Sequence, residues 1–127
     1  MLLVDDLEAN RFLLEEALGD LGADVFCADG GRRALQIAAD AHPHVVVLDF
    51  QMPDLNGAET ARALKLVGSP FTYVIMTSGY QEAGDGDAID TSSVDRFLVK
   101  PYTLDDLRAS VVEGLRISRE RRSAVTS

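Results

Sequence analysis

The chain has 127 residues, 46% of them hydrophobic and 26% charged, and its 21 acidic and 12 basic side chains give a formal net charge of −9 at pH 7. This composition predicts a single acidic globular domain, because the chain is too short for two hydrophobic cores and too apolar to be disordered. The negative charge argues against direct binding of nucleic acid, since that affinity depends on lysine and arginine.

Two further features of the sequence bear on its location in the cell. No apolar run approaches the roughly 18 residues of a membrane-spanning helix, and the first residues lack the basic and apolar segments of a signal peptide. The single cysteine, Cys27, cannot form an internal disulfide, which is typical of a reducing compartment. We therefore expect a cytoplasmic protein that does not bind membranes.

The first part of the predicted domain contains two strands, each followed by a helix. The apolar runs Met1–Val4 and Val25–Ala28 predict the strands, and the residues after each run have apolar side chains at helical spacing. Gly22 and Pro43 predict the ends of the two helices. The apolar stripes are formed by Leu7, Leu14, Ala17, Leu18 and Leu21, and by Ala34, Leu35, Ile37, Ala38 and Ala41.

Three more apolar runs, Val45–Leu48, Tyr73–Met76 and Phe97–Val99, predict the remaining strands. All five runs are continuous rather than alternating, which is typical of parallel strands that are buried on both faces. Thr103 and Asp106 have the spacing of a capping box, so we expect the last helix to begin at this point. The helical stripes in this part are Ala58, Ala61, Leu64 and Leu66, and Leu104, Leu107, Val111 and Leu115.

The alternation of strands and helices predicts an α/β fold, with a doubly wound parallel sheet and helices on both faces. The helix expected within residues 81–92 is rich in glycine and aspartate, so we expect it to be short or mobile. We expect the domain to span residues 1–121 and residues 122–127 to form a C-terminal tail, with the arginines near the end on a solvated helix end or at the start of a linker. His42 and His44 are predicted to lie on the surface, at the end of the sheet where the third strand starts.

Polar side chains follow four of the five predicted strands, at the sheet edge where open α/β sheets bind ligands. They are Asp5 and Asp6, Asp49, Thr77 and Ser78, and Lys100. Three adjacent carboxylates raise one another's pKa unless a cation lies among them, and Mg²⁺ is the hard cation that binds one or two carboxylates and retains water. A carboxylate beside Mg²⁺, a lysine and a hydroxyl can attack phosphorus and form an acyl phosphate.

The same residues stand in four ordered motifs. These are Val4-Asp5-Asp6, Leu48-Asp49 followed by Met52-Pro53 and Gly57, Ile75-Met76-Thr77-Ser78-Gly79, and Phe97-Leu98-Val99-Lys100-Pro101. Together they resemble the receiver domains of two-component response regulators over essentially the whole chain. The stretches at residues 5–11 and 29–35 are most similar to receivers attached to hybrid histidine kinases. The resemblance implies a five-stranded, flavodoxin-like sheet in the order 2-1-3-4-5.

The resemblance also implies which residues perform the chemistry. Asp49 would accept a phosphoryl group from a phosphohistidine, which makes the chain a phosphoprotein of a phosphorelay. Asp6, Asp49 and the backbone carbonyl of Gln51 would bind Mg²⁺ directly, and Asp5 would bind it through a water. Lys100 would contact the phosphoryl oxygens, and the peptide bond that follows Lys100 would be cis.

Three further positions concern the response to phosphorylation. The motif alignment assigns the switch hydroxyl to Ser78 rather than Thr77, and the small Gly79 beside it leaves room for the phosphoryl group. Phe97 occupies the position of the family's switch aromatic. Gln51 and Tyr80 occupy positions that tune hydrolysis in the family, and we expect a moderately long-lived phosphate.

As a whole, the resemblance implies a signalling module rather than an enzyme, which switches partner binding through its fourth helix, fifth strand and fifth helix. The partners implied are a histidine kinase or histidine phosphotransfer protein, and an effector or attached domain outside this chain; a phosphorylation-dependent homodimer is a further option. The alternatives are an aspartyl-phosphate phosphatase, disfavoured because Gln51 replaces its second acid, and a degenerate receiver that acts only as an interaction module. The intact set of acids, hydroxyl and lysine argues against the latter.

Overall fold

The computed structural model describes residues 1–52, 54–67, 70–79 and 92–126, and its five strands form one parallel sheet. The strands lie in the order β2-β1-β3-β4-β5, so the predicted order and parallel arrangement are confirmed. Their bounds are β1 (Leu2–Val4), β2 (Phe26–Ala28), β3 (Val45–Asp49), β4 (Tyr73–Ser78) and β5 (Arg96–Val99).

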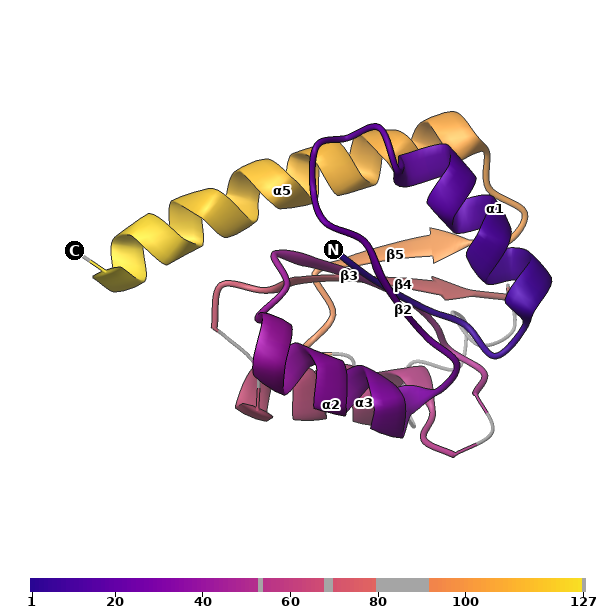
Figure 1. Ribbon diagram of the computed structural model, residues 1–127, viewed down its shortest axis with the longest axis horizontal. Coiled ribbons are helices and arrows are strands. Elements are labelled where there is room, and N and C mark those ends of the chain that lie inside the picture. The colour runs from indigo at the N-terminus through magenta and orange to yellow at the C-terminus, as the bar shows by residue number, and fades with distance from the viewer. Residues whose placement is uncertain (53, 68–69, 80–91, 127) are drawn as a thin grey trace.

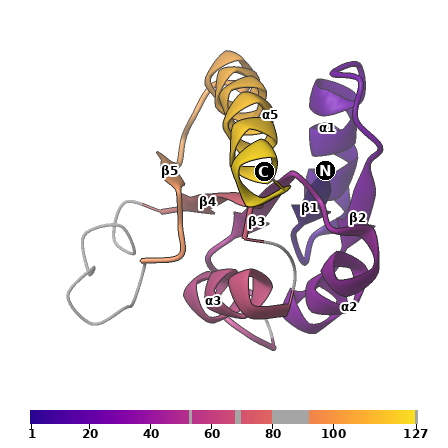
Figure 2. The ribbon, with the colours of Figure 1, turned by 90° about the vertical axis from the view of Figure 1, so that its left-hand side faces the viewer.

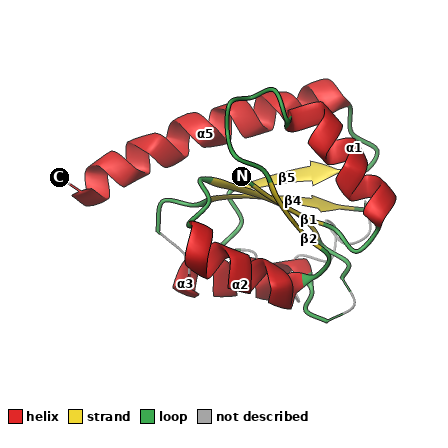
Figure 3. Cartoon of the chain, in the orientation of Figure 1, coloured by secondary structure: helices red, strands yellow, loops and turns green. Residues whose placement is uncertain are grey.

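Helices cover both faces of the sheet, as predicted (Figures 1, 2 and 3). Helices α1 (Glu8–Leu18) and α5 (Leu104–Thr126) lie on one face, and α2 (Gly31–Ala41) and α3 (Gly57–Val67) lie on the other. The helix predicted within residues 81–92 falls almost entirely outside the described residues. None of the helices in the described part of the chain combines the length and apolar character needed to cross a bilayer.

The continuous apolar runs supply two separate cores, because successive side chains of a strand point to opposite faces of the sheet. Leu3 and Val47 pack under α1 and α5, whereas Leu2 and Val46 pack over α2 and α3. The helices contribute the predicted stripe residues Leu14, Leu18, Leu107, Val111 and Leu115 on one face, and Ala34, Ala38, Ala61 and Leu64 on the other.

Parts of the predicted helical stripes are wrong. Helix α1 ends at Leu18, so Leu21 packs against the core from the turn that follows rather than from the helix. Leu7 precedes the helix, is 57% exposed, and uses its backbone N–H to bind the Asp5 carboxylate. Leu66, near the end of α3, and Leu104, the first residue of α5, are both exposed and do not pack in the core.

Helix α5 begins as the capping box predicts and continues through the residues expected to form a tail. The Asp106 backbone N–H donates to Thr103 Oγ1 at 3.0 Å, and the helix runs on to Thr126. His42 is exposed, as predicted, and His44 is partly exposed. The His44 Nδ1 lies 2.9 Å from Oγ of Ser118, a fully buried residue of α5.

Candidate functional site

Three carboxylates meet at the carboxyl ends of β1 and β3, which are neighbours in the sheet. Asp5 and Asp6 follow β1, and Asp49 is the last residue of β3. One oxygen from each carboxylate lies within 4.8 Å of the other two. Asp5 and Asp49 are buried and Asp6 is exposed, so the group combines fixed ligands with access from solvent.

The Asp5 carboxylate is held in place by groups at the start of α1. Its Oδ1 accepts a hydrogen bond from the Leu7 backbone N–H at 2.9 Å, and its Oδ2 accepts one from Asn10 Nδ2 at 3.3 Å. Burial raises the pKa of Asp5, and the charge of Asp49 acts in the same direction, against the hydrogen bond from Leu7. A bound cation removes this penalty on the ionised form, so the donor set fits a hard divalent metal such as Mg²⁺.

Lys100 reaches the same site from the end of β5. Its Nζ lies 3.1 Å from Asp49 Oδ2, and its backbone N–H donates to the backbone oxygen of Ser78 at 2.8 Å, which extends the pairing of β4 and β5. The Lys100–Pro101 peptide bond is cis, as predicted. The Gln51 backbone N–H approaches Asp49 Oδ1 at 3.4 Å, and the Gln51 side chain is exposed.

The two candidate hydroxyl residues, Thr77 and Ser78, are the last two residues of β4. Thr77 pairs in register with Asp49, and its backbone oxygen accepts from the Phe50 N–H at 2.9 Å. Ser78 is 2% exposed, and its Oγ has no hydrogen-bond partner among the described residues. Because a buried hydroxyl without a partner is costly, the Ser78 hydroxyl is a candidate to donate a hydrogen bond to an incoming oxygen. Phe97, the candidate switch aromatic, is 40% exposed on β5 rather than part of the core.

The loop between β3 and α3 is attached to its surroundings by residues that sequence reasoning missed. Asp54 accepts hydrogen bonds from the backbone N–H groups of Gly31 and Arg32, each at 3.0 Å, and these bonds lower its pKa. They replace the side-chain cap that Gly30 cannot provide at the start of α2. A Cβ on Gly57 would lie 2.7 Å from the Phe50 Cα, so this motif glycine lets the loop pack closely.

A cavity of about 330 Å³ opens beside Asp5 and Lys100. Sequence reasoning did not assign Asn10 to the site, although one helical turn from Leu7 brings it back over Asp5. The cavity is lined by Asp5, Asn10, Leu13, Leu14, Lys100, Pro101, Tyr102 and Leu104.

The family of the chain follows from the match of residues 1–112 to the response regulator receiver domain. The chain belongs to this family, whose members act in two-component signalling and bind Mg²⁺ at an acidic cluster of the kind that Asp5, Asp6 and Asp49 form. Receiver domains are typically signalling modules rather than enzymes.

Curated relatives place this receiver among several kinds of protein. The regulatory protein AtoC of Escherichia coli is 30% identical over 117 residues, which cover 92% of this chain and 25% of AtoC. The response regulator MprA of Mycolicibacterium vanbaalenii is 34% identical over 91% of this chain and 50% of its own length. The sensor kinase/phosphatase LuxN of Vibrio harveyi is 33% identical over 85% of this chain and 12% of its own. The chain thus spans half or less of these relatives.

Solved structures agree with this assignment. A structure described as adenylate cyclase from Rhodopirellula baltica has a TM-score of 0.88 and 27% identity, with 98% of this chain and 93% of that chain covered. A response regulator receiver domain protein from Clostridium thermocellum has a TM-score of 0.82 at 23% identity, with 98% and 96% covered, and supports the fold.

Replacing Asp5 by asparagine is expected to raise the Tm of the metal-free protein by a few degrees and to weaken its stabilisation by Mg²⁺. A carboxyl group whose pKa is raised in the folded state stabilises the fold only at low pH, and this stabilisation is lost as the pH rises through the folded-state pKa. The ionised Asp5 carboxylate therefore destabilises the fold at pH 7. Thermal melts with and without Mg²⁺ measure both effects. Asp40→Asn, at an exposed position on α2, is the control and should retain the full Mg²⁺ response. An unchanged Mg²⁺ response in Asp5→Asn would contradict a metal-binding role for Asp5.

Proposed function

We propose that this receiver domain accepts a phosphoryl group on Asp49 from the phosphohistidine of a histidine kinase or histidine phosphotransfer protein. The observation that carries the proposal is the position of the Asp49 carboxylate, within 4.8 Å of Asp5 and Asp6 oxygens and 3.1 Å from Lys100 Nζ. A carboxylate placed between a metal-binding group and an ammonium can attack phosphorus while positive charge balances the phosphoryl oxygens.

In the proposed transfer, an Asp49 oxygen bonds to phosphorus as the bond from phosphorus to the imidazole nitrogen breaks. The electron pair of that bond stays on the imidazole, which takes up a proton, and Asp49 becomes an acyl phosphate. Asp6, Asp49 and the Gln51 carbonyl would hold Mg²⁺ directly, with Asp5 acting through a water, and the ion supplies positive charge when bound. The Lys100 ammonium group donates a hydrogen bond to one of the phosphoryl oxygens.

Ser78 and Phe97 are proposed to carry the response to phosphorylation. A phosphoryl oxygen offers the buried Ser78 hydroxyl the acceptor that it lacks among the described residues. The exposed Phe97 ring changes the molecular surface if it becomes buried. These two changes would alter the face of β5, α5 and the predicted fourth helix and thereby switch partner binding.

The receiver is proposed to cover residues 1–121 and to act in a cytoplasmic phosphorelay. AtoC and MprA are longer than this chain, which supports an output that comes from an attached domain or a separate effector. A homodimer that forms on phosphorylation is a further proposed state. The Gln51 side chain has no carboxyl group that could act as the general acid or base of a phosphatase. We propose that the phosphate on Asp49 is moderately long-lived. Tyr80, the second residue expected to tune that lifetime, lies outside the described residues.

Incubation with acetyl phosphate and Mg²⁺ tests the proposed function. We expect one phosphoryl group per chain, stable in acid and labile in base, as for an acyl phosphate, and mass mapping should locate it on Asp49. Removal of Mg²⁺ with EDTA should suppress the reaction. A wild-type protein that binds Mg²⁺ but never acquires the adduct would overturn the proposal and favour a receiver that acts only as an interaction module.

A further inference from the structure

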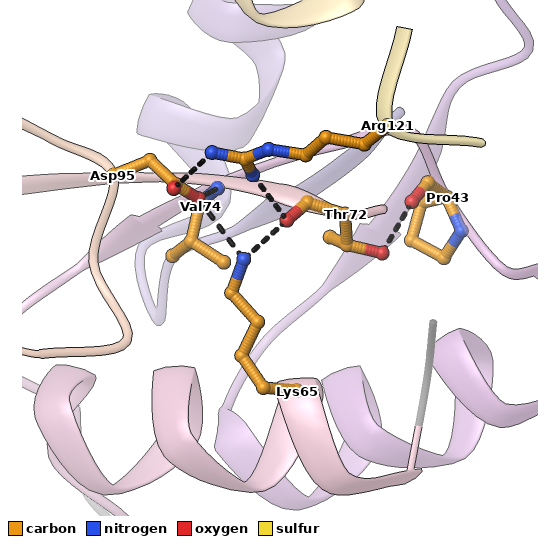
Figure 4. A network of polar contacts seen from close by, with 6 residues as sticks. All are labelled: Pro43, Lys65, Thr72, Val74, Asp95 and Arg121. Carbon is orange, nitrogen blue, oxygen red and sulfur yellow. Dashed lines mark hydrogen bonds and ion pairs between the residues drawn. The ribbon is translucent and has the colours of Figure 1, made fainter. Parts of the chain in front are cut away.

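A second polar cluster lies at the end of the sheet opposite to Asp49, where β4 and β5 begin (Figure 4). Its centre is Asp95, the residue before β5. Asp95 Oδ1 accepts from Arg121 Nη2 at 2.7 Å, and Oδ2 accepts from Lys65 Nζ at 3.1 Å and from the Val74 N–H at 2.8 Å. The cluster therefore joins α3, β4, β5 and the last turns of α5.

The Asp95 carboxylate is partly buried, and its hydrogen bonds compensate for this burial. The Asp95 side chain is 16% exposed, and burial alone would raise its pKa, but the hydrogen bonds from Arg121, Val74 and Lys65 outweigh burial and lower it. Arg121 and Lys65 also donate to the backbone oxygen of Thr72. Removing Arg121 leaves a partly buried carboxylate with fewer partners, which is costly in such networks.

Arg121 fixes a part of α5 that lies beyond the residues matched to the family, which end at residue 112. Its guanidinium also lies 5.5 Å from the centre of the Tyr73 ring at the start of β4. One turn earlier, the buried Ser118 contacts His44 at 2.9 Å. The C-terminal turns of α5 are thus attached to the starts of the strands rather than free in solvent.

Strand β5 connects this cluster to the candidate phosphorylation site. Asp95 immediately precedes the strand and Lys100 immediately follows it. The strand has four residues, three of them exposed, and it pairs with β4 alone among the described strands. A short, exposed edge strand opens at low free energy, so its order depends strongly on how its two ends are held.

We propose that β5 couples the two clusters, so that occupation of the Asp49 site holds the C-terminal turns of α5 more firmly. This inference rests on the proposed function. A phosphoryl group gives Lys100 a second anionic partner, which fixes the end of β5, stabilises its pairing with β4, and favours the contact between Asp95 and Arg121. Coupling of this kind is reciprocal, so loss of Arg121 must weaken binding at the Asp49 site.

Hydrogen exchange tests the coupling in wild type, Arg121→Gln and Arg116→Gln, each with Mg²⁺ and with or without beryllofluoride, a phosphoryl mimic. In the wild type, we expect beryllofluoride to slow exchange of amides 117–124 by on the order of 5-fold, the lower end of typical allosteric coupling. Arg121→Gln should raise exchange without the ligand and lose the response to it. Among the described residues, Arg116 forms ion pairs only with Glu113 and Glu120 of its own helix, so Arg116→Gln should behave as the wild type.

Fluorine NMR of bound beryllofluoride in the same samples separates the possible failures. A bound signal with unchanged exchange of residues 117–124 in the wild type overturns the coupling and leaves the proposed function intact. A retained response in Arg121→Gln also overturns the coupling. No bound signal in the wild type overturns the proposed function and the coupling together. Asp95→Asn, which keeps the size of the side chain, should reproduce the effect of Arg121→Gln on hydrogen exchange. If Arg121→Gln fails to fold, the response of Asp95→Asn to beryllofluoride tests the coupling in its place.

Discussion

Replacing Asp49 by asparagine is expected to reduce phosphorylation by acetyl phosphate by more than about 10⁴-fold, the scale of loss when a catalytic nucleophile is removed. The amide has nearly the shape of the carboxylate but is not a nucleophile toward phosphorus, and it cannot form an acyl phosphate. It also removes one of the charges in the acidic group with Asp5 and Asp6. The initial rate of adduct formation, followed by intact mass, measures the loss.

The matched control is Asp54→Asn in the same loop. Asp54 is exposed and binds the first N–H groups of α2, so its substitution should lower stability slightly and leave the labelling rate close to that of the wild type. Adduct formation in Asp49→Asn at the wild-type rate would show that another residue is the acceptor. Equal losses in both variants would instead indicate damage to the loop.

Lys100→Met is expected to slow phosphorylation by roughly 100-fold, the usual cost of removing one charge-stabilising donor from a reacting centre. The Nζ lies 3.1 Å from Asp49 Oδ2, where it can balance charge on the transferred group. Mg²⁺ affinity should not fall, because removing a cation leaves the carboxylates more negative. The comparison of labelling rate with Mg²⁺ affinity therefore distinguishes a role in transfer from a role in metal binding.

Arg108→Met provides the control for Lys100→Met, since Arg108 also pairs with an aspartate, Asp20, but outside both polar clusters. We expect Arg108→Met to label at close to the wild-type rate. A Lys100→Met protein that is phosphorylated normally would show that the ammonium does not participate in transfer.

The sheet and the site were largely predictable because their signals are local. Each strand is a continuous apolar run, and each site residue follows directly at its carboxyl end, so the strand order alone brings Asp5, Asp6, Asp49 and Lys100 together. The predicted strands fell short only where polar residues continue the pairing, as Ser78 does in β4. Apolar character stops there, whereas backbone pairing does not.

The features that sequence reasoning missed depend on contacts between distant residues. Asp54 caps α2 from 22 or 23 residues away, and Arg121 meets Asp95 across 26 residues. Nothing in the spacing of either pair distinguishes it from ordinary surface charge. The contact of His44 with Ser118 was missed for the same reason, because Ser118 lies 74 residues further along the chain.

Because the chain has only two lysines, chemical labelling of their amines can be followed at each of them separately. Lys65 and Lys100 are its two lysines, each against a carboxylate at opposite ends of the sheet. Their side chains are 24% and 41% exposed, so an amine-directed reagent can reach both. Acylation at Lys100 depends on what occupies the Asp49 site, and acylation at Lys65 depends on the state of the Asp95 cluster. The two products therefore report on the two ends of the sheet separately, in one molecule of unaltered sequence.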